Sequence, residues 1–154
     1  MADMAQWYKD YIGAWNSHDF GKIAPFFTPD CSYQDMAFGS TFQGIKEIEN
    51  LVKTTFVMSS DIKFEMKSFF NLGNCAAGEW VMSGTHTGDV PGMKATGKKF
   101  SIQCSAIMEL SEGKIKRNTS YYNFSALLMQ IGWLPRAPAN WMGRLMMRFM
   151  TKRQ

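Results

Sequence analysis

Apolar side chains near the N-terminus recur at the spacing of a helix that buries one face. Met4, Tyr8, Tyr11, Ile12 and Trp15 stand at positions i, i+4, i+7, i+8 and i+11. This spacing places all five on one side of an α-helix. We therefore expect a first helix that packs this stripe against a core.

Two further helices and one strand are expected in the next forty or so positions. After a polar break, in which His18 is expected as a solvated loop residue, Asp19 is placed to cap a short second helix that carries Ile23. A β-type run then ends in Asp35. Apolar residues over 45–56 return to helical spacing and predict a third helix.

From residue 62 onward, apolar side chains recur at every second position instead of at helical spacing. Ile62, Phe64, Met66 and Phe70 alternate with charged side chains, which predicts a strand with one wet face. Further strands are expected over 75–86, 100–110 and 115–122, and a short helix over 125–131. Helices followed by strands indicate an α+β fold with segregated elements.

The second of these strands leads into an unusual loop. Trp80, Met82 and His86 share one face of the strand. The loop over 85–99 is rich in Gly, contains Pro91 and is long for a hairpin. Its length and composition fit a lid over a site.

The last segment, 140–152, combines helical spacing with a basic face. Its apolar side is formed by Trp141, Leu145, Met146 and Phe149, and its basic side by Arg144, Arg148 and Lys152. A basic amphipathic helix packs on its own domain or on a partner subunit, or makes a peripheral contact with an anionic membrane surface. We divide the chain into a domain over 1–135 and a tail over 136–154.

Size and composition describe one globular domain. The 154 residues are 45% apolar and 14% aromatic, which suffices for a core. Three cysteines, an odd number without C-x-x-C spacing, argue against a disulfide framework or a zinc site. No secretory signal or membrane-spanning apolar run is recognisable, so we expect a cytoplasmic protein with reduced thiols.

Positive charge is concentrated at one end of the chain. Residues 133–154 hold five bases and no acid, more than the whole net charge of +4, so the rest of the chain is close to neutral. A nucleic-acid-binding domain needs a basic face on its folded part. No nucleic-acid partner is therefore expected.

The strongest candidate for chemistry is Asp35, an ionisable residue that precedes large apolar side chains. Burial disfavours the charged form of a carboxyl group, and this tuning equips the group to act as a base or an acid. The alternative is a structural role, in which Asp35 caps the turn before Gly39. Tyr11 and His86 are the further catalytic candidates, as a phenolic donor and a second titratable group.

Other side chains are expected to line a cavity around these three residues. Tyr33 is in phase with Asp35 along the chain, and Tyr121 is in phase with Asn123. The expected substrate-binding residues are Trp15, Tyr33, Trp80, Met82, Ser105, Tyr121 and Asn123. Because there are only two histidines, with no carboxylate at ligand spacing to either, we expect no metal. No cofactor is expected either.

Four segments of the sequence resemble known proteins. Residues 14–35 read AWNSHDFGKIAPFFTPDCSYQD, 84–100 read GTHTGDVPGMKATGKKF, 109–117 read ELSEGKIKR, and 121–135 read YYNFSALLMQIGWLP. They resemble SnoaL-like polyketide cyclases and ketosteroid isomerases of the nuclear-transport-factor-2-like superfamily. The resemblance implies a cone-shaped α+β barrel, with three N-terminal helices packed on a curved antiparallel sheet and an extra C-terminal helix. It also implies an apolar cavity and a homodimer.

The resemblance also implies roles for single residues. Tyr11 stands where ketosteroid isomerases carry the tyrosine that donates a hydrogen bond to the enolate oxygen, and Asp35 stands where they carry the carboxylate base. Their protonated aspartate would fall near Cys104 or Ser105, neither of which is a carboxylic acid. His86 matches the histidine of the family's G-x-H-x-G loop motif.

The cyclases are implied to use a different pair. Their histidine and aspartate, near the final hairpin, fall at Ala106 and Ser120 in this sequence, so this pair is absent. The leading hypothesis is a cofactor-free proton-transfer enzyme, an isomerase, cyclase or dehydratase, with Asp35 as general base. Its substrate would be a small hydrophobic carbonyl compound such as a polyketide, terpenoid or steroid. The alternative is a non-catalytic protein of the same fold that binds hydrophobic ligands, associated with membranes through its C-terminal helix.

Overall fold

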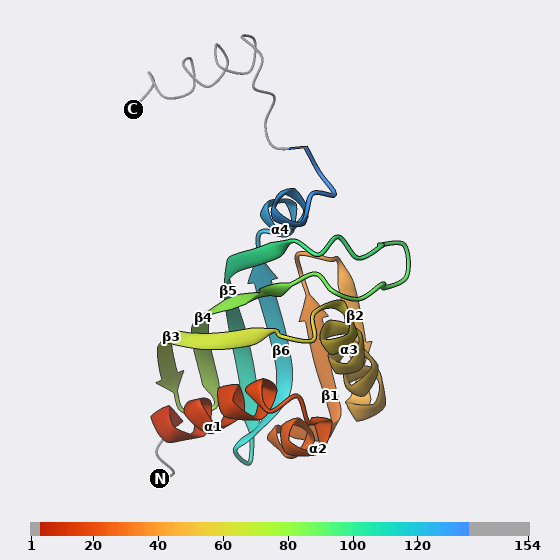
Figure 1. Ribbon diagram of the computed structural model, residues 1–154. Coiled ribbons are helices and arrows are strands. Elements are labelled where there is room, and N and C mark those ends of the chain that lie inside the picture. Colours follow the sequence, from red (N-terminus) through yellow and green to blue (C-terminus); the bar gives the residue numbers. More distant parts are fainter. Residues whose placement is uncertain (1–3, 136–154) are drawn as a thin grey trace, which may run out of the picture.

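Four α-helices pack on a six-stranded sheet within residues 4–135, the part of the chain that the computed structural model describes (Figure 1). The helices are α1 (Met4–Asn16), α2 (Phe20–Ile23), α3 (Gly44–Met58) and α4 (Phe124–Ile131). The strands are β1 (Phe27–Asp35), β2 (Ser40–Gln43), β3 (Lys63–Leu72), β4 (Cys75–Thr85), β5 (Lys99–Ser111) and β6 (Lys114–Tyr122). The tail over 136–154, with the amphipathic helix expected there, lies outside the described residues.

The helices form where the apolar spacing predicts them, and local hydrogen bonds fix their ends. The α1 helix buries the expected stripe, including Tyr11 and Trp15. The Asp19 side chain caps α2 by accepting a hydrogen bond from the backbone N–H of Gly21, 2.8 Å away. The α4 helix ends at Gly132, whose φ of 82° is a left-handed conformation that glycine adopts without strain.

The sheet confirms the α+β class and is mixed and open rather than a closed antiparallel barrel. Its strand order is β2-β1-β6-β5-β4-β3, and β3 to β6 form the expected antiparallel meander. β1 pairs with β6 in parallel, and the short strand β2, which no sequence pattern indicated, pairs with β1. The edge strands β2 and β3 do not pair with each other, so the described part of the sheet is not closed.

A bulge in β3 reverses the side-chain pattern of that strand. The pairing with β4 shifts register between Met66 and Ser68. Phe64 and Met66 pack on the core, but beyond the bulge Phe69 takes the inward place and Phe70 is 64% exposed. The expectation that Phe70 shares a face with Phe64 is therefore wrong, because one extra residue turns every later side chain to the other face.

Three helices cover different parts of the sheet. The α1 helix lies against β3, α3 against β1, and α4 against β5. Because the sheet curves, these helices surround the space in front of its inner face (Figure 1). Within residues 4–135, no helix is both long and apolar enough to cross a membrane.

Candidate functional site

An apolar cavity of about 390 Å³ lies between α1, α3 and the inner face of the sheet. Its walls are largely apolar side chains, and it is partly open to solvent. This volume lies within the usual range of small-molecule sites. The lining includes the expected residues Tyr11, Trp15, Tyr33, Asp35, Trp80 and Met82.

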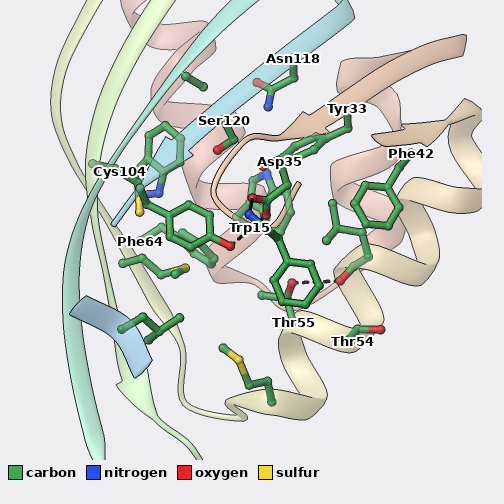
Figure 2. A pocket seen from close by; sticks show the side chains of 18 of the residues that line it. Trp15, Tyr33, Asp35, Phe42, Thr54, Thr55, Phe64, Cys104, Asn118 and Ser120 are labelled. Carbon is green, nitrogen blue, oxygen red and sulfur yellow. Dashed lines mark hydrogen bonds between the residues drawn. The ribbon is translucent and has the colours of Figure 1, made fainter. Parts of the chain in front are cut away.

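Asp35 is the last residue of β1, and its half-buried carboxylate lies in the cavity wall (Figure 2). Oδ1 accepts hydrogen bonds from the backbone N–H groups of Ala37, at 3.1 Å, and Phe38, at 2.8 Å. Oδ2 accepts a hydrogen bond from the Tyr122 hydroxyl, at 2.9 Å. The backbone C=O of Asp35 accepts from the N–H of Gly39. Asp35 thus caps the turn before Gly39 and also borders the cavity, so the two roles do not exclude each other.

Tyr122 is the partner of Asp35 that sequence reasoning did not find. It ends β6, lines the cavity and donates its hydroxyl hydrogen to Asp35. Burial, reinforced by the negative charge of Asp35, raises the pKa of Tyr122 well above its usual value. The hydroxyl therefore stays protonated at neutral pH and remains a donor.

A second bulge explains why alternation along β6 points to Tyr121 instead. The pairing of β5 with β6 shifts register between Glu109 and Leu110, next to Ile115. Alternation carried forward from buried Ile115 would turn Tyr121 inward. The bulge reverses it, so Tyr121 is 42% exposed and does not line the cavity, while Tyr122 does. The structure therefore places Tyr121 outside the cavity in which we expected it to bind substrate.

Two other expected binding residues also lie away from the cavity. Ser105 stands between Cys104 and Ala106, which line the cavity, and its side chain therefore points to the other face of β5. Asn123 caps α4, because its side-chain oxygen accepts a hydrogen bond from the backbone N–H of Ala126 at 2.9 Å. Neither Ser105 nor Asn123 is among the lining residues.

Tyr11 and Tyr33 bring two more phenol groups to the cavity. Tyr33 lies on the same face of β1 as Asp35 (Figure 2). Burial raises the pKa of Tyr11 well above its usual value and that of Tyr33 to about 12. Both hydroxyl groups are therefore protonated at neutral pH and able to donate hydrogen bonds.

Ala106 and Ser120, the positions of the absent cyclase pair, are opposite each other on β5 and β6. Both line the cavity, and Ser120 is also the register partner of Asp35 across β1 and β6. The resemblance therefore points to positions that border the site. Neither side chain can exchange a proton near neutral pH as histidine does.

His86 is fully buried but stands apart from the cavity lining, in the loop after β4. Its Nδ1 lies 3.3 Å from the Thr96 hydroxyl oxygen, and its Nε2 has no hydrogen-bond partner among the described residues. Burial lowers the pKa of His86, and the negative charge of Asp89 opposes this shift. The structure therefore does not bring His86 together with Asp35 and Tyr11 in one cavity.

The loop that holds His86 nevertheless borders the cavity. Val90, Pro91 and Met93 are among the lining residues. An exposed ion pair between Asp89 and Lys94, at 2.6 Å, connects the two arms of the loop. This placement is the one expected of a lid.

His18 is not the solvated loop residue that its sequence context predicts. Its Nε2 lies 2.8 Å from the backbone carbonyl oxygen of Ile62, and its ring stacks on Phe56 with centroids 4.6 Å apart. These contacts attach the turn between α1 and α2 to the residue before β3. His18 therefore has a structural role.

Cys104 brings a thiol to the cavity wall. Burial raises the pKa of Cys104 to about 12, so the thiol stays protonated and is a poor nucleophile. Within residues 4–135, no group of three or more His, Cys, Asp or Glu side chains is placed to hold a metal ion.

Solved structures share this architecture. AclR, a candidate hydroxylase from Streptomyces galilaeus, is similar with a TM-score of 0.79 and 21% identity, over 99% of this chain and 92% of AclR. TsrD from Streptomyces laurentii gives a TM-score of 0.76 and 20% identity, over 86% of this chain and 97% of TsrD. IdmH, a candidate polyketide cyclase from Streptomyces antibioticus, gives 0.73 and 17%, over 84% of this chain and 99% of IdmH. At these identities the similarity shows the fold.

The sequence itself shows the family. No curated protein matches the chain. The sequence profile of the SnoaL-like polyketide cyclases matches residues 2–131. The chain therefore belongs to the SnoaL-like polyketide cyclase family.

Proposed function

We propose that the protein is a cofactor-free enzyme that moves a proton next to the carbonyl group of a small hydrophobic substrate. Asp35 removes the proton, and the electron pair of the broken C–H bond passes to the carbonyl oxygen, which gives an enolate. The enolate regains a proton at another carbon, attacks a second carbonyl group, or expels a hydroxyl group. These three outcomes are isomerisation, cyclisation and dehydration.

The hydrogen bonding of Asp35 is the observation that carries this proposal. An ionised carboxylate has about four acceptor sites. Ala37, Phe38 and Tyr122 fill three of them, and all three are donors, which suits the ionised form. One acceptor site remains on Oδ2, at the wall of an apolar cavity. A fixed carboxylate with one free acceptor site is what a general base requires.

The tyrosines supply the other groups that the reaction needs. Tyr122 holds Oδ2 and acts as a positioning residue. Tyr11 and Tyr33, both protonated, donate hydrogen bonds to the enolate oxygen and stabilise its negative charge. His86 has no part in this mechanism, since it lies outside the cavity lining.

The substrate that fits best is a polyketide-like carbonyl compound. Apolar walls favour a hydrophobic skeleton, and the volume suits a small molecule. The description of the family and of IdmH as a candidate polyketide cyclase also supports this class. Terpenoids and steroids with a carbonyl group share the required chemistry.

One observation favours a second candidate function, a non-catalytic protein that binds hydrophobic ligands. Ala106 and Ser120 line the cavity where the resemblance implies a histidine and an aspartate, so that pair of proton carriers is lacking. A cavity without them still binds apolar molecules. The two candidates differ in whether a bound carbonyl compound loses a proton.

Deuterium exchange into 2-tetralone, a bicyclic ketone with acidic protons beside its carbonyl, separates the two candidates. We expect the protein to accelerate this exchange in heavy water, followed by NMR. Asp35→Asn should lower the accelerated rate by about 100-fold or more, because general-base catalysis contributes at least that factor. Binding of 2-tetralone should persist in this variant. Asp30→Asn, on the same strand but exposed, is the matched control and should exchange at the unmodified rate.

Two results would contradict the enzyme. Equal exchange by the Asp35→Asn variant would remove Asp35 as the base. Binding of 2-tetralone without acceleration of exchange would favour the binding protein.

A further inference from the structure

Tyr8 is a buried polar residue of the cavity that the proposed reaction does not use. It lies on α1, is 0% exposed and lines the cavity. Its ring stacks on Phe69 with centroids 4.4 Å apart. Its hydroxyl has no hydrogen-bond partner among the described residues. Buried hydroxyl groups in native proteins are normally hydrogen-bonded, so this exception requires an explanation.

The sheet is shaped to admit this hydroxyl. A methyl group built on Gly78 of β4 would overlap the Tyr8 hydroxyl and its ring carbon. Ala106, the register partner of Gly78 on β5, is also small and lines the cavity. The absence of side-chain bulk at these two positions lets the phenol pack closely against the inner face of the sheet.

The Tyr8 hydroxyl and Asp35 lie at opposite ends of one row across the sheet. Gly78, Ala106, Ser120 and Asp35 are successive register partners on β4, β5, β6 and β1. Three steps of about 4.8 Å between neighbouring strands separate the ends of this row, about 14 Å along the sheet. A ligand that contacts both ends therefore has to extend across the inner face of four strands.

The Tyr8 hydroxyl can serve such a ligand as a donor. Burial, with smaller contributions from Cys104 and Glu79, raises the pKa of Tyr8 well above its usual value. The hydroxyl is therefore protonated at neutral pH. It can donate a hydrogen bond to an acceptor oxygen, and no residue within 4–135 takes that hydrogen bond.

We propose that Tyr8 is a specificity-determining residue that donates a hydrogen bond to a second oxygen of the substrate. The substrate then carries two oxygen functions, a carbonyl at the Asp35 end and an acceptor oxygen at the Tyr8 end, joined by a rigid apolar skeleton. The assignment of the carbonyl end rests on the proposed function. The assignment of the second oxygen rests on Tyr8 alone.

Two pairs of probes test this inference by calorimetry. One pair is 2-tetralone and 6-hydroxy-2-tetralone, and the longer pair is 3-deoxyestrone and estrone. Within each pair, only the second compound has an oxygen at the far end. We expect that oxygen to raise the affinity of the unmodified protein about three- to tenfold in the pair whose length matches the cavity, the usual value of one neutral hydrogen bond.

Substitution assigns this gain to Tyr8. In Tyr8→Phe the affinity ratio of the matching pair should fall to about one, because only the hydroxyl is removed. Tyr121→Phe, which removes an exposed hydroxyl outside the cavity, should keep the ratio of the unmodified protein.

Three results would overturn the inference. The first is an affinity ratio that Tyr8→Phe leaves unchanged. The second is an affinity ratio of one in both probe pairs of the unmodified protein, as expected if a water molecule hydrogen-bonds to the Tyr8 hydroxyl. The third is no binding of any of the four probes at millimolar concentration.

Failure of the proposed reaction gives a different result. If Asp35 is not the base, Asp35→Asn leaves deuterium exchange unchanged while the affinity ratio still depends on Tyr8. If only the inference about Tyr8 fails, Asp35→Asn still lowers the accelerated exchange rate by about 100-fold or more, and Tyr8→Phe leaves the affinity ratio unchanged.

Discussion

The two polar ends of the cavity are built in opposite ways. At one end, the carboxylate of Asp35 receives two backbone hydrogen bonds and one from Tyr122. At the other end, the hydroxyl of Tyr8 receives and makes none among the described residues. The first group is held in place by the protein alone. The second has hydrogen-bonding capacity that no residue within 4–135 uses.

His86 shows that an unsatisfied buried atom does not by itself mark a site. In the described part of the chain, its Nε2 has no hydrogen-bond partner, as is also true of the Tyr8 hydroxyl, and both side chains are 0% exposed. His86, however, is not among the residues that line the cavity, whereas Tyr8 is. A missing hydrogen-bond partner therefore indicates a ligand contact at Tyr8, whereas at His86 it indicates a cost to folding.

Gly78→Ala should have the largest effect on stability, because it disturbs the packing of Tyr8 at the end of the cavity where the hydroxyl has no described partner. The added methyl group overlaps the rigid, fully buried ring of Tyr8. Overpacking of this kind lowers the free energy of unfolding by about 1–3 kcal/mol, as measured by urea denaturation. The variant should also lose the preference for the probe with a second oxygen, since the hydroxyl is displaced.

Gly13→Ala on α1 is the matched control for this change. An added methyl group there meets no atom within 4 Å. In a helix interior, Ala is more stable than Gly by about 0.5–1 kcal/mol. Equal unfolding free energies for Gly78→Ala and the unmodified protein would mean that the Tyr8 ring moves freely, and the two ends would no longer differ in rigidity.

Tyr122→Phe should have the next largest effect, at the partnered end. It removes the donor to Oδ2 of Asp35, a half-buried carboxylate. We expect the free energy of unfolding to fall by about 1 kcal/mol, within the range for a lost hydrogen bond. Deuterium exchange into 2-tetralone should slow while Tyr121→Phe, an exposed neighbour, leaves both quantities unchanged. Unchanged exchange in Tyr122→Phe would show that Asp35 needs no such partner.

Periodicity along the chain was enough to predict most of the fold. Apolar stripes marked α1 and α3, alternation marked the meander, and Asp19 marked the start of α2. The parallel pairing of β1 with β6 could not be predicted in this way. It joins strands that are far apart in the sequence, and no local pattern records which strands become neighbours.

The site was harder to predict than the fold, because the inward position at the end of β6 depends on a register shift in that strand. Asp35, Tyr11, Tyr33 and Trp15 precede the bulges in β3 and β6, and each lines the cavity as expected, although β1 also shifts register against β6 between Phe27 and Ser32. Tyr121 was expected in place of Tyr122, because a bulge changes phase without a clear sequence signal. Whether the Tyr8 hydroxyl has a hydrogen-bond partner depends on its neighbours in three dimensions. No spacing in the sequence could therefore reveal that it lacks one among the described residues.

Acid should destabilise the protein through His86, with a smaller effect than the changes at the cavity. Burial lowers the pKa of His86 in the folded protein, whereas the unfolded chain has the ordinary value near 6.5. As pH falls below about 6.5, the unfolded chain binds a proton that the folded protein does not, so stability is lost. Asp89 opposes this loss because its negative charge favours the protonated ring.

Urea denaturation at pH 7.5 and pH 5.5, about one unit on either side of that value, measures this effect. His86→Gln should reduce the difference in unfolding free energy between the two conditions. An equal difference in the His86→Gln variant and in the unmodified protein would contradict the prediction.

Tyr8→Phe should have the smallest effect on stability. This small effect would distinguish the Tyr8 end of the cavity most clearly from the Asp35 end. Removing a hydroxyl normally costs a hydrogen bond, about 1 kcal/mol, but no described residue pairs with Tyr8. Phe keeps the ring that stacks on Phe69, and it is not penalised for a buried polar atom without a partner. The free energy of unfolding without ligand should therefore stay the same or rise by a few tenths of a kcal/mol. A loss of about 1 kcal/mol or more in urea denaturation would mean that the protein itself satisfies the hydroxyl. The hydroxyl would then have no unused capacity for a substrate oxygen, and Tyr8 would be a structural residue like His18.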